Sequence, residues 1–171
     1  FGVGVLVTGP SGIGKSESAL DLILRGHRFV SDDVVPIKKR HESVIASGSE
    51  LTRHHMEVRG LGIINVRDLF GAAAVRQQKK IELVVELIEW SRDLKQDRTG
   101  LEQRYERLVE VEVPKIILAI RPGRNIASII EVAARNHLLK VQGHDPARDF
   151  EKSIEAVLHA PIIQRIQLES E

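Results

Sequence analysis

The chain has 171 residues, of which 42% are hydrophobic and 29% charged, a balance typical of one soluble globular domain. Lys and Arg number 25 against 24 Asp and Glu, and aromatic residues make up 4%. Neither value is that of a nucleic-acid-binding protein. No run of about 18 apolar residues occurs, which excludes a membrane span, so we expect neither nucleic acid nor a membrane as partner. Cysteine is absent, which excludes disulfides and thiolate chemistry and favours a cytoplasmic location.

The first half of the chain begins with a strand, a loop and a helix. The apolar, β-branched run at 3–8 predicts a buried strand. A glycine-rich loop follows, and apolar residues then recur with helical spacing over 15–25. The other elements expected here are a strand at 28–30, a hairpin of 34–37 and 43–46 across a polar turn, a loop at 47–53 and a short helix at 66–74.

The second half predicts several strands and then two helices. Ile81, Leu83, Val85 and Leu87 would share one face of a strand at 80–88. The other expected features are an exposed loop at 89–106, strands at 108–113 and 116–120, a turn at 121–124, a helix capped by Asn125, a last helix that starts at Asp145-Pro146 and ends at Pro161, and partial burial of Trp90 and Tyr105. This order of elements indicates a single-domain α/β or α+β fold.

A phosphate-binding loop is the most specific motif. Residues 9–16 match G-x-x-x-x-G-K-[ST] at every fixed position, between a predicted strand and a predicted helix. The backbone N–H groups of such a loop and the helix N-terminus surround an anion. Lys15 would contact the β- and γ-phosphates of a nucleotide, and Ser16 would ligate Mg²⁺. The candidate nucleotide-binding residues are Gly9, Pro10, Ser11, Gly12, Ile13, Gly14, Lys15 and Ser16.

An acidic pair, Asp32 and Asp33, follows the predicted strand 28–30. If that strand lay beside the first one, the pair would reach the phosphate loop at the carboxyl edge of the sheet. Adjacent carboxylates point to different sides, so one could face Mg²⁺ and the other an incoming hydroxyl group. A simple turn containing two Asp residues is the alternative.

Other charged residues carry weaker signals. Glu57, in the glycine-flanked stretch 56–62, is by pattern alone most consistent with a solvated side chain. His54-His55 with Glu57 lacks a further ligand at zinc-like spacing, which favours a surface loop. Arg98, Arg121 and Arg124 are each consistent with surface arginines, although guanidinium groups at the turn after residue 120 would suit phosphate oxygens.

Taken together, several separated motifs resemble one known family. The stretches GPSGIGKSESALDLILRGHRFVSDD, EVRGLGIINV, FGAAAVR, DRTG and RPGRNIASIIEVAARN occur in this order. The chain is similar to the HPr kinase/phosphorylase family from its first residue to about residue 150. It departs from the family pattern at Pro10, where Asp is usual, and at Ala119, where Pro is usual.

The resemblance implies a fold and an activity. The fold would be an α/β, P-loop-containing kinase domain with a mixed sheet, related to phosphoenolpyruvate carboxykinase. Members use ATP and Mg²⁺ to phosphorylate a serine of the phosphocarrier HPr. They also transfer the phosphoryl group from that serine to inorganic phosphate, which releases pyrophosphate. They control carbon catabolite repression in the bacterial cytoplasm and form homo-hexamers. Residues 1–171 would be the C-terminal catalytic domain of a longer protein, without its N-terminal domain.

The resemblance also assigns roles to residues. Lys15 and Arg98 correspond to catalytic residues, and Asp33 to the general base of the kinase reaction and the general acid of its reverse. Ser16 and Glu57 correspond to Mg²⁺ ligands, with Asp32 as a further candidate. Arg121 and Arg124, which we take as catalytic, fall in the segment tied to dephosphorylation.

Two alternatives stay open from the residues. One is a P-loop kinase of a small metabolite, and the other is a nucleotide-sensing interaction module without catalysis. Incubation with labelled ATP and either HPr or metabolites would distinguish a metabolite kinase from a member of the HPr kinase/phosphorylase family. Tight ATP binding without turnover would favour the second.

Overall fold

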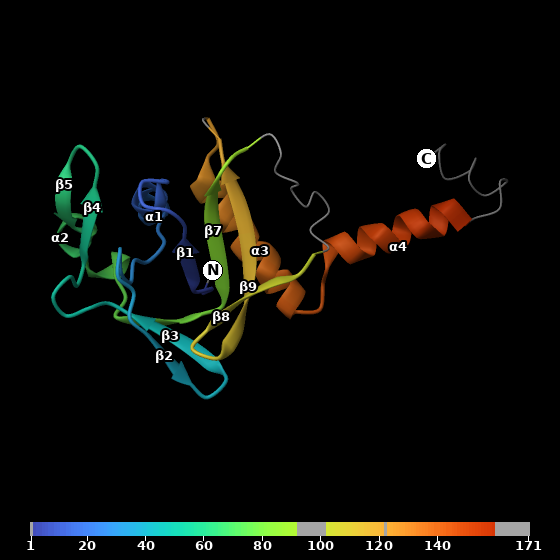
Figure 1. The fold of residues 1–171 in the computed structure, drawn as a ribbon, viewed down its shortest axis with the longest axis horizontal. Helices are drawn as coiled ribbons and strands as arrows, with labels where there is room; N and C mark the ends of the chain where they lie inside the picture. Colours follow the sequence, from blue (N-terminus) through green and yellow to red (C-terminus); the bar gives the residue numbers. More distant parts are fainter. Residues whose placement is uncertain (1, 92–101, 122, 160–171) are drawn as a thin grey trace.

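A computed structural model of the chain describes residues 2–91, 102–121 and 123–159. Its centre is a four-stranded sheet in the order β1-β7-β9-β8, in which β1, β7 and β9 are parallel and β8 is antiparallel to β9 (Figure 1). These strands are β1 (Val5–Thr8), β7 (Leu83–Glu89), β8 (Arg104–Leu108) and β9 (Val111–Ile120). The predicted α/β class and mixed sheet are therefore confirmed.

The central sheet is covered on both faces. Leu83, Val85 and Leu87 of β7 pack against α1 (Lys15–Leu24) and α3 (Ile126–Val141) on one face. Val84 faces the other way, into a cluster with Val44 and Ile81 of a second, antiparallel sheet. The strands of that sheet are β2 (Ile37–Arg40), β3 (Ser43–Ser47) and β6 (Gln78–Ile81). This alternation along β7 gives three layers, with helices, central sheet and small sheet in turn.

Two further parts lie beside this core. A hairpin of β4 (His55–Val58) and β5 (Gly62–Asn65) leads into α2 (Val66–Phe70) and the 3₁₀ turn η1 (Ala72–Ala74), and α4 (Pro146–His159) runs outward from the sheet (Figure 1). The Asn65 carboxamide accepts from Arg67 and Asp68, which caps α2. No helix in the described ranges is long and apolar enough to cross a membrane.

The predicted strand at 28–30 is wrong. Only Phe29 forms a bridge, parallel to Val75. The place beside β1 belongs to β7, whose apolar run is buried on both faces. Phe29 is instead 5% exposed in a cluster with Met56 and Val66, which holds the chain that leads to the acidic pair.

Two other strand predictions misplace their turns, and one hairpin was not predicted. Lys38, Lys39 and Arg40 were expected in a turn but belong to β2, because the reversal occurs at His41 with φ 54°. The strand expected at 108–113 is interrupted where Val109 and Glu110 both have positive φ between β8 and β9. The hairpin of β4 and β5 was not expected as strands at all.

The strand expected at 80–88 is two strands. Glu82 separates them, and its carboxylate accepts from the backbone N–H of Gly4 at 2.9 Å. Ile81 therefore faces the small sheet, whereas Leu83, Val85 and Leu87 share the helix-facing side as predicted. Strand β1 is half-buried rather than buried, because it lies at the edge of the central sheet.

The helix starts are confirmed. Asn125 Oδ1 accepts from the backbone N–H of Ser128 at 2.9 Å, and α4 begins at Pro146. The predicted stop at Pro161 lies outside the described residues. Trp90 and Tyr105 are 39% and 51% exposed, so the expected partial burial of these aromatic residues is wrong.

Candidate active site

The predicted phosphate loop connects the end of β1 to the start of α1. Gly9, Gly12 and Gly14 have φ of 141°, 84° and 101°, which L side chains rarely adopt. A Cβ atom on Gly9 would lie 2.4 Å from the carbonyl oxygen of Leu87, so glycine lets the loop approach β7 closely. The N-cap of α1, Gly14, makes no side-chain hydrogen bond, which leaves the first N–H groups of this helix open for an anion.

Lys15 is held by the loop that precedes it. Its Nζ donates to the carbonyl oxygens of Gly9 at 3.0 Å and Pro10 at 2.9 Å. Both bonds fix the ammonium group within the turn, beside the N-terminus of α1. The loop thus combines one full positive charge with the partial charge of the helix end, which suits a polyphosphate.

Asp32 joins the loop to the β4–β5 hairpin. Ser16 Oγ donates to Asp32 at 3.1 and 3.2 Å to its two carboxylate oxygens, and the backbone N–H of Glu57 donates to Asp32 at 3.2 Å. The predicted meeting of this acidic pair with the loop therefore occurs, although the burial of Phe29 brings it about and an adjacent strand does not.

The oxygen donors here fit Mg²⁺. Ser16 and Asp32 are in contact, and Glu57 follows directly after the buried Met56, so its carboxylate is on the exposed side of β4. Mg²⁺ takes one or two protein oxygen ligands together with water and substrate phosphates. In the described ranges no group of three or more His, Asp or Glu side chains forms a self-sufficient metal cage, and His54 and His55 gather no further ligand there.

Asp33 has an unusual backbone. Its φ is 47°, in the left-handed region that non-glycine residues seldom occupy. Its side chain is exposed, and within the described ranges it makes no hydrogen bond or ion pair. A strained residue with a free carboxylate beside an anion-binding loop is typical of a functional group.

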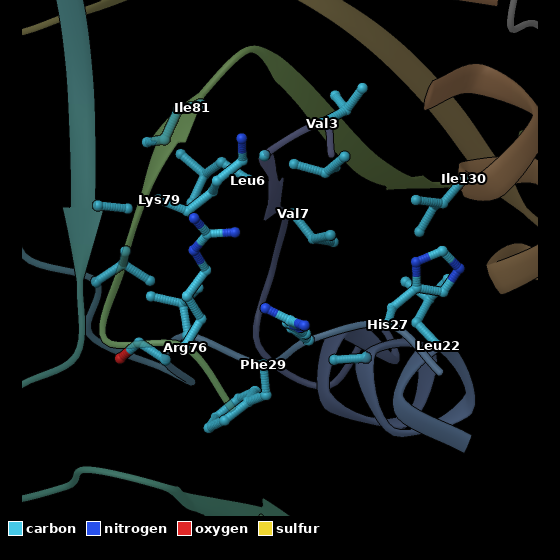
Figure 2. A pocket seen from close by; sticks show the side chains of 18 of the residues that line it. Val3, Leu6, Val7, Leu22, His27, Phe29, Arg76, Lys79, Ile81 and Ile130 are labelled. Atoms are coloured by element: carbon cyan, nitrogen blue, oxygen red, sulfur yellow. The ribbon is translucent and has the colours of Figure 1, made fainter. Parts of the chain in front are cut away.

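A cavity of about 520 Å³ extends from the loop along the open side of β1. Val7, Leu22 and Phe29 contribute apolar walls, and His27 and Arg76 add polar groups (Figure 2). Lys15, Asp32 and Asp33 belong to the same lining. The carboxylate pair and the lysine therefore border one hollow.

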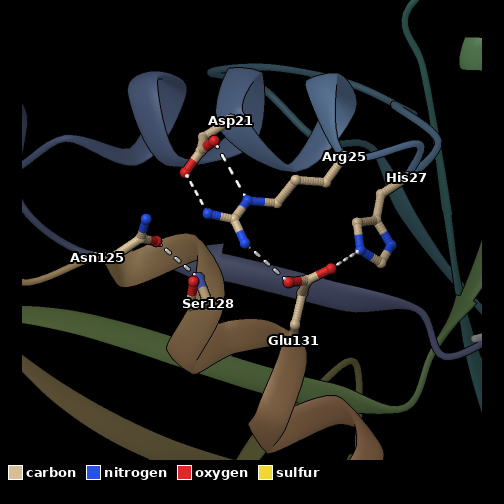
Figure 3. A network of polar contacts seen from close by, with 6 residues as sticks. All are labelled: Asp21, Arg25, His27, Asn125, Ser128 and Glu131. Carbon is tan, nitrogen blue, oxygen red and sulfur yellow. Dashed lines mark hydrogen bonds and ion pairs between the residues drawn. The ribbon is translucent and has the colours of Figure 1, made fainter.

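A polar network fixes α1 against α3 (Figure 3). Arg25 bonds both Asp21 and Glu131, and Nε2 of His27 lies 2.7 Å from Oε1 of Glu131. The hydrogen bond from His27, followed by that from Arg25, holds the pKa of the Glu131 carboxyl below its ordinary 4.5. These contacts link the far end of the loop's helix to α3.

Two of the predicted arginines, Arg121 and Arg124, make contacts outside the loop. Arg121 follows β9 and stacks on the Trp90 ring, with its Cζ 4.1 Å from the ring centroid. Arg124 donates from Nη1 to the carbonyl oxygen of Ala119 at 3.4 Å. Arg98 lies outside the described residues. No contact in the described ranges joins Arg121 or Arg124 to Lys15.

Two residues of this region were missed as candidates. Arg59 approaches Gly12 so closely that a Cβ atom there would lie 2.7 Å from its Nη2. Gly60 and Gly62, which follow Arg59 in the sequence, were the signal that could have pointed to this close approach. Partial burial is the expectation for Trp90, and its place directly after an apolar strand gives no hint of a stacked arginine.

An anion-binding loop at the end of β1, an oxygen-ligand pair and a free carboxylate beside it would suit the binding of a phosphate group. The family model for the HPr Serine kinase C-terminal domain matches residues 1–154. The chain belongs to this family, which confirms the predicted resemblance.

Relatives agree with this assignment. The chain is 51% identical over 90% of its length to the HPr kinase/phosphorylase of Geobacter sulfurreducens, and 55% identical over 91% to that of Chloroherpeton thalassium. It covers 49% and 46% of those two proteins, so it spans about half the length of the curated relatives. The solved Hpr(Ser) kinase/phosphatase from Coxiella burnetii is 40% identical, with a TM-score of 0.77 over 86% of this chain and 90% of that one. A kinase family implies the use of a nucleotide and a metal.

Proposed function

We propose that this chain is the catalytic domain of a protein that phosphorylates a serine of HPr and also reverses that step. The observation that carries the proposal is the convergence of Lys15, Ser16 and Asp32 beside the free carboxylate of Asp33. The names of the relatives at about half identity support HPr as the substrate. The remaining length of those relatives would form the separate N-terminal domain.

The nucleotide is ATP, bound with Mg²⁺ in a P-loop kinase fold related to phosphoenolpyruvate carboxykinase. Loop residues 9–16 hold its β- and γ-phosphates, with Lys15 as the catalytic cation. Ser16 and Glu57 would hold Mg²⁺, with Asp32 as ligand or as acceptor of the Ser16 hydroxyl. The metal, when bound, neutralises charge on the transferred phosphoryl group.

Asp33 handles the proton. In the kinase direction its carboxylate accepts the proton of the serine hydroxyl while the serine oxygen bonds to the γ-phosphorus and ADP leaves. General-base help of this kind contributes about 10²–10⁴-fold. In reverse, an oxygen of inorganic phosphate bonds to the phosphorus of phosphoserine, the serine oxygen leaves with a proton from Asp33, and pyrophosphate forms.

The arginines stabilise charge on the groups in transfer. Arg98, Arg121 and Arg124 are the proposed catalytic arginines, and a guanidinium group binds phosphate oxygens in a bidentate manner. Arg121 and Arg124 follow the carboxyl end of β9, which points to the same edge of the sheet as the loop after β1.

Assembly into a homo-hexamer in the bacterial cytoplasm is part of the proposal. Helix α4 supports a protein contact, since Phe150, Ile154 and Leu158 recur with helical spacing and are 68%, 43% and 58% exposed. The lack of cysteine agrees with a reducing compartment.

Incubation of the complete protein with HPr and ATP–Mg²⁺, followed by mass spectrometry, tests the function. One added phosphate on an HPr serine is expected, and later addition of inorganic phosphate should remove it and release pyrophosphate. Asp33→Asn is the matched control. Phosphorylation of a metabolite instead of HPr, or ATP binding without turnover, would replace the proposal with one of the alternatives.

A further inference from the structure

The tip of the β4–β5 hairpin lies against the phosphate loop. A Cβ atom on Gly12 would lie 2.7 Å from Nη2 of Arg59, 3.3 Å from its Nη1 and 3.4 Å from its Cζ. The guanidinium group therefore rests on the backbone of the loop, where any larger side chain would displace it. Arg59 is thus a part of the loop's surroundings that comes from a distant stretch of the sequence.

The hairpin that carries Arg59 is fixed to the rest of the site. Met56 packs in a buried cluster that includes part of α1, and the backbone N–H of Glu57 donates to the Asp32 carboxylate at 3.2 Å. The turn that begins with Arg59 is closed by a backbone hydrogen bond of 3.0 Å across residues 58–61. The start of the arginine side chain is therefore held in place, beside the loop.

The N–H groups of Arg59 are unused. Within 2–91, 102–121 and 123–159 no acceptor bonds them and no carboxylate pairs with them. The carboxylate that anchors the hairpin, Asp32, accepts instead from Ser16 and from the backbone of Glu57. A guanidinium group offers several donors in one plane, and such a fork fits two oxygens of one phosphate.

Positive charge gathers at this loop without a counterion. The N-terminus of α1 and the ammonium group of Lys15 are already there, and Lys15 bonds only the carbonyl oxygens of Gly9 and Pro10. Arg59 adds a second full charge, and neither cation has an ion pair among the residues that the structure describes. Like charges this close repel one another, and a bound anion would turn that cost into attraction.

We infer that Arg59 is a phosphate-binding residue, whose N–H groups contact the anion held by the loop. This rests on the proposed function and deepens it. The anion is the polyphosphate of ATP in the kinase direction, and in reverse it is the inorganic phosphate that becomes part of pyrophosphate. Arg59 takes no part in proton transfer, which stays with Asp33. The hairpin thus supplies the site with a carboxylate, from Glu57, and a cation.

A binding test needs no turnover. The complete protein is titrated calorimetrically with pyrophosphate in the presence of Mg²⁺. Arg59→Gln should raise the Kd about 10- to 100-fold, because a charge-assisted contact is lost. Arg59→Lys keeps the charge without the planar fork and should restore part of the affinity. Arg40→Gln is the matched control, since Arg40 is an exposed arginine at the turn of the other hairpin, and it should bind as the parent does.

Thermal melting separates phosphate binding from a structural role. Arg59 bonds nothing in the described part of the chain, so ligand-free Arg59→Gln should melt at the temperature of the parent. The rise in melting temperature that pyrophosphate produces should be smaller in this variant. An unchanged Kd for pyrophosphate would overturn the inference. So would equal losses of affinity in Arg59→Lys and Arg59→Gln together with a lowered melting temperature of the ligand-free protein.

Kinetics test the claim that one residue serves both directions. Arg59→Gln should raise the KM for ATP in HPr phosphorylation and the KM for inorganic phosphate in the reverse reaction by similar factors. A rise in only one of these two constants would contradict a contact with the anion common to both reactions.

The two proposals fail in distinguishable ways. If the complete protein transfers no phosphate to HPr, the proposed function fails, while the pyrophosphate titration still tests Arg59. If HPr is phosphorylated and dephosphorylated but Arg59→Gln binds pyrophosphate as the parent does, only the role of Arg59 fails.

Discussion

The two sides of the site are built in different ways. On the loop side, Lys15, Ser16 and Asp32 are joined by hydrogen bonds of 2.9 to 3.2 Å between the loop, α1 and the segment after Phe29. On the arginine side, Arg121 is held by a ring stack and Arg124 by one bond of 3.4 Å. Hydrogen-bonded ions have fixed directions, whereas a stacked guanidinium group can slide over the ring.

This difference matches the two directions of the proposed chemistry. The polyphosphate occupies the same loop whether ATP is consumed or pyrophosphate is formed, so a rigid cradle serves both. The group opposite the loop is a serine hydroxyl in one direction and a phosphoserine in the other. A side that adjusts to each acceptor is then an advantage, and substitutions should affect the two sides differently.

The largest expected effect separates proton transfer from nucleotide binding. Asp33→Asn should lower kcat for HPr phosphorylation about 10²–10⁴-fold, because the amide cannot accept the serine proton. Asparagine tolerates the left-handed backbone at φ 47°, so the turn should persist. Initial rates and calorimetric titration with ATP check this. Loss of ATP binding would mean that Asp33 serves mainly the metal or the fold.

The second effect distinguishes two serines on one helix. Ser16→Ala should raise the Mg²⁺ concentration for half-maximal kinase activity about 10- to 100-fold, since an oxygen that contacts Asp32 is lost. Ser18 donates to the carbonyl oxygen of Gly14 and is buried, so Ser18→Ala should lower the melting temperature without changing the Mg²⁺ requirement. An equal Mg²⁺ shift in both variants would contradict the assigned role of Ser16.

The loop side was also the more predictable side. The motif at residues 9–16 is local, and its glycines, lysine and serine carry their chemistry wherever a strand and a helix flank them. The place of Asp32 was anticipated for the wrong reason, because burial of Phe29 against Met56 and Val66 replaces the expected strand pairing. Such tertiary contacts leave no periodic signal along the chain.

The arginine side depends on strand register. Trp90 meets Arg121 only because β7 and β9 are parallel with Glu89 opposite Ile120, and these residues are 31 positions apart. The approach of Arg59 to Gly12 likewise depends on tertiary structure, because it requires the β4–β5 hairpin. The glycines in the stretch 56–62 interrupt the strand pattern, so the hairpin could not be predicted. Local pattern predicts elements, but not which side chains two elements bring together.

A smaller effect concerns the close contact between Gly12 of the loop and the Arg59 side chain. Gly12→Ala places a methyl group 2.7 Å from Arg59 Nη2 and strains a backbone at φ 84°. Gly143→Ala has similar strain at φ 91° with nothing within 4 Å. Both should lose about 1–2 kcal/mol of unfolding free energy, whereas only Gly12→Ala should raise the KM for ATP, about 5-fold. Denaturant unfolding and kinase rates check this. Equal KM values for ATP in the two variants would mean that the Arg59 side chain moves aside without affecting nucleotide binding.

The smallest expected effect concerns the polar network of Glu131, His27 and Arg25, which holds α1 against α3. The pKa of Glu131 is lowered by His27 and then Arg25, so its contribution to stability is present above the unfolded value of about 4.5 and is lost as pH falls through the lower folded pKa. Glu131→Gln should therefore have a lower melting temperature than the parent at pH 6. Between pH 5 and pH 3 its melting temperature should fall less than that of the parent.

Glu112→Gln provides the control for this pH profile, because Glu112 has no ion pair in the described ranges. Its melting profile should follow that of the parent. If α1 needs the His27–Glu131–Arg25 network to present the loop, Glu131→Gln should also raise the KM for ATP slightly. An unchanged KM for ATP would show that the loop is held in place without this network, and the network would then contribute to stability alone.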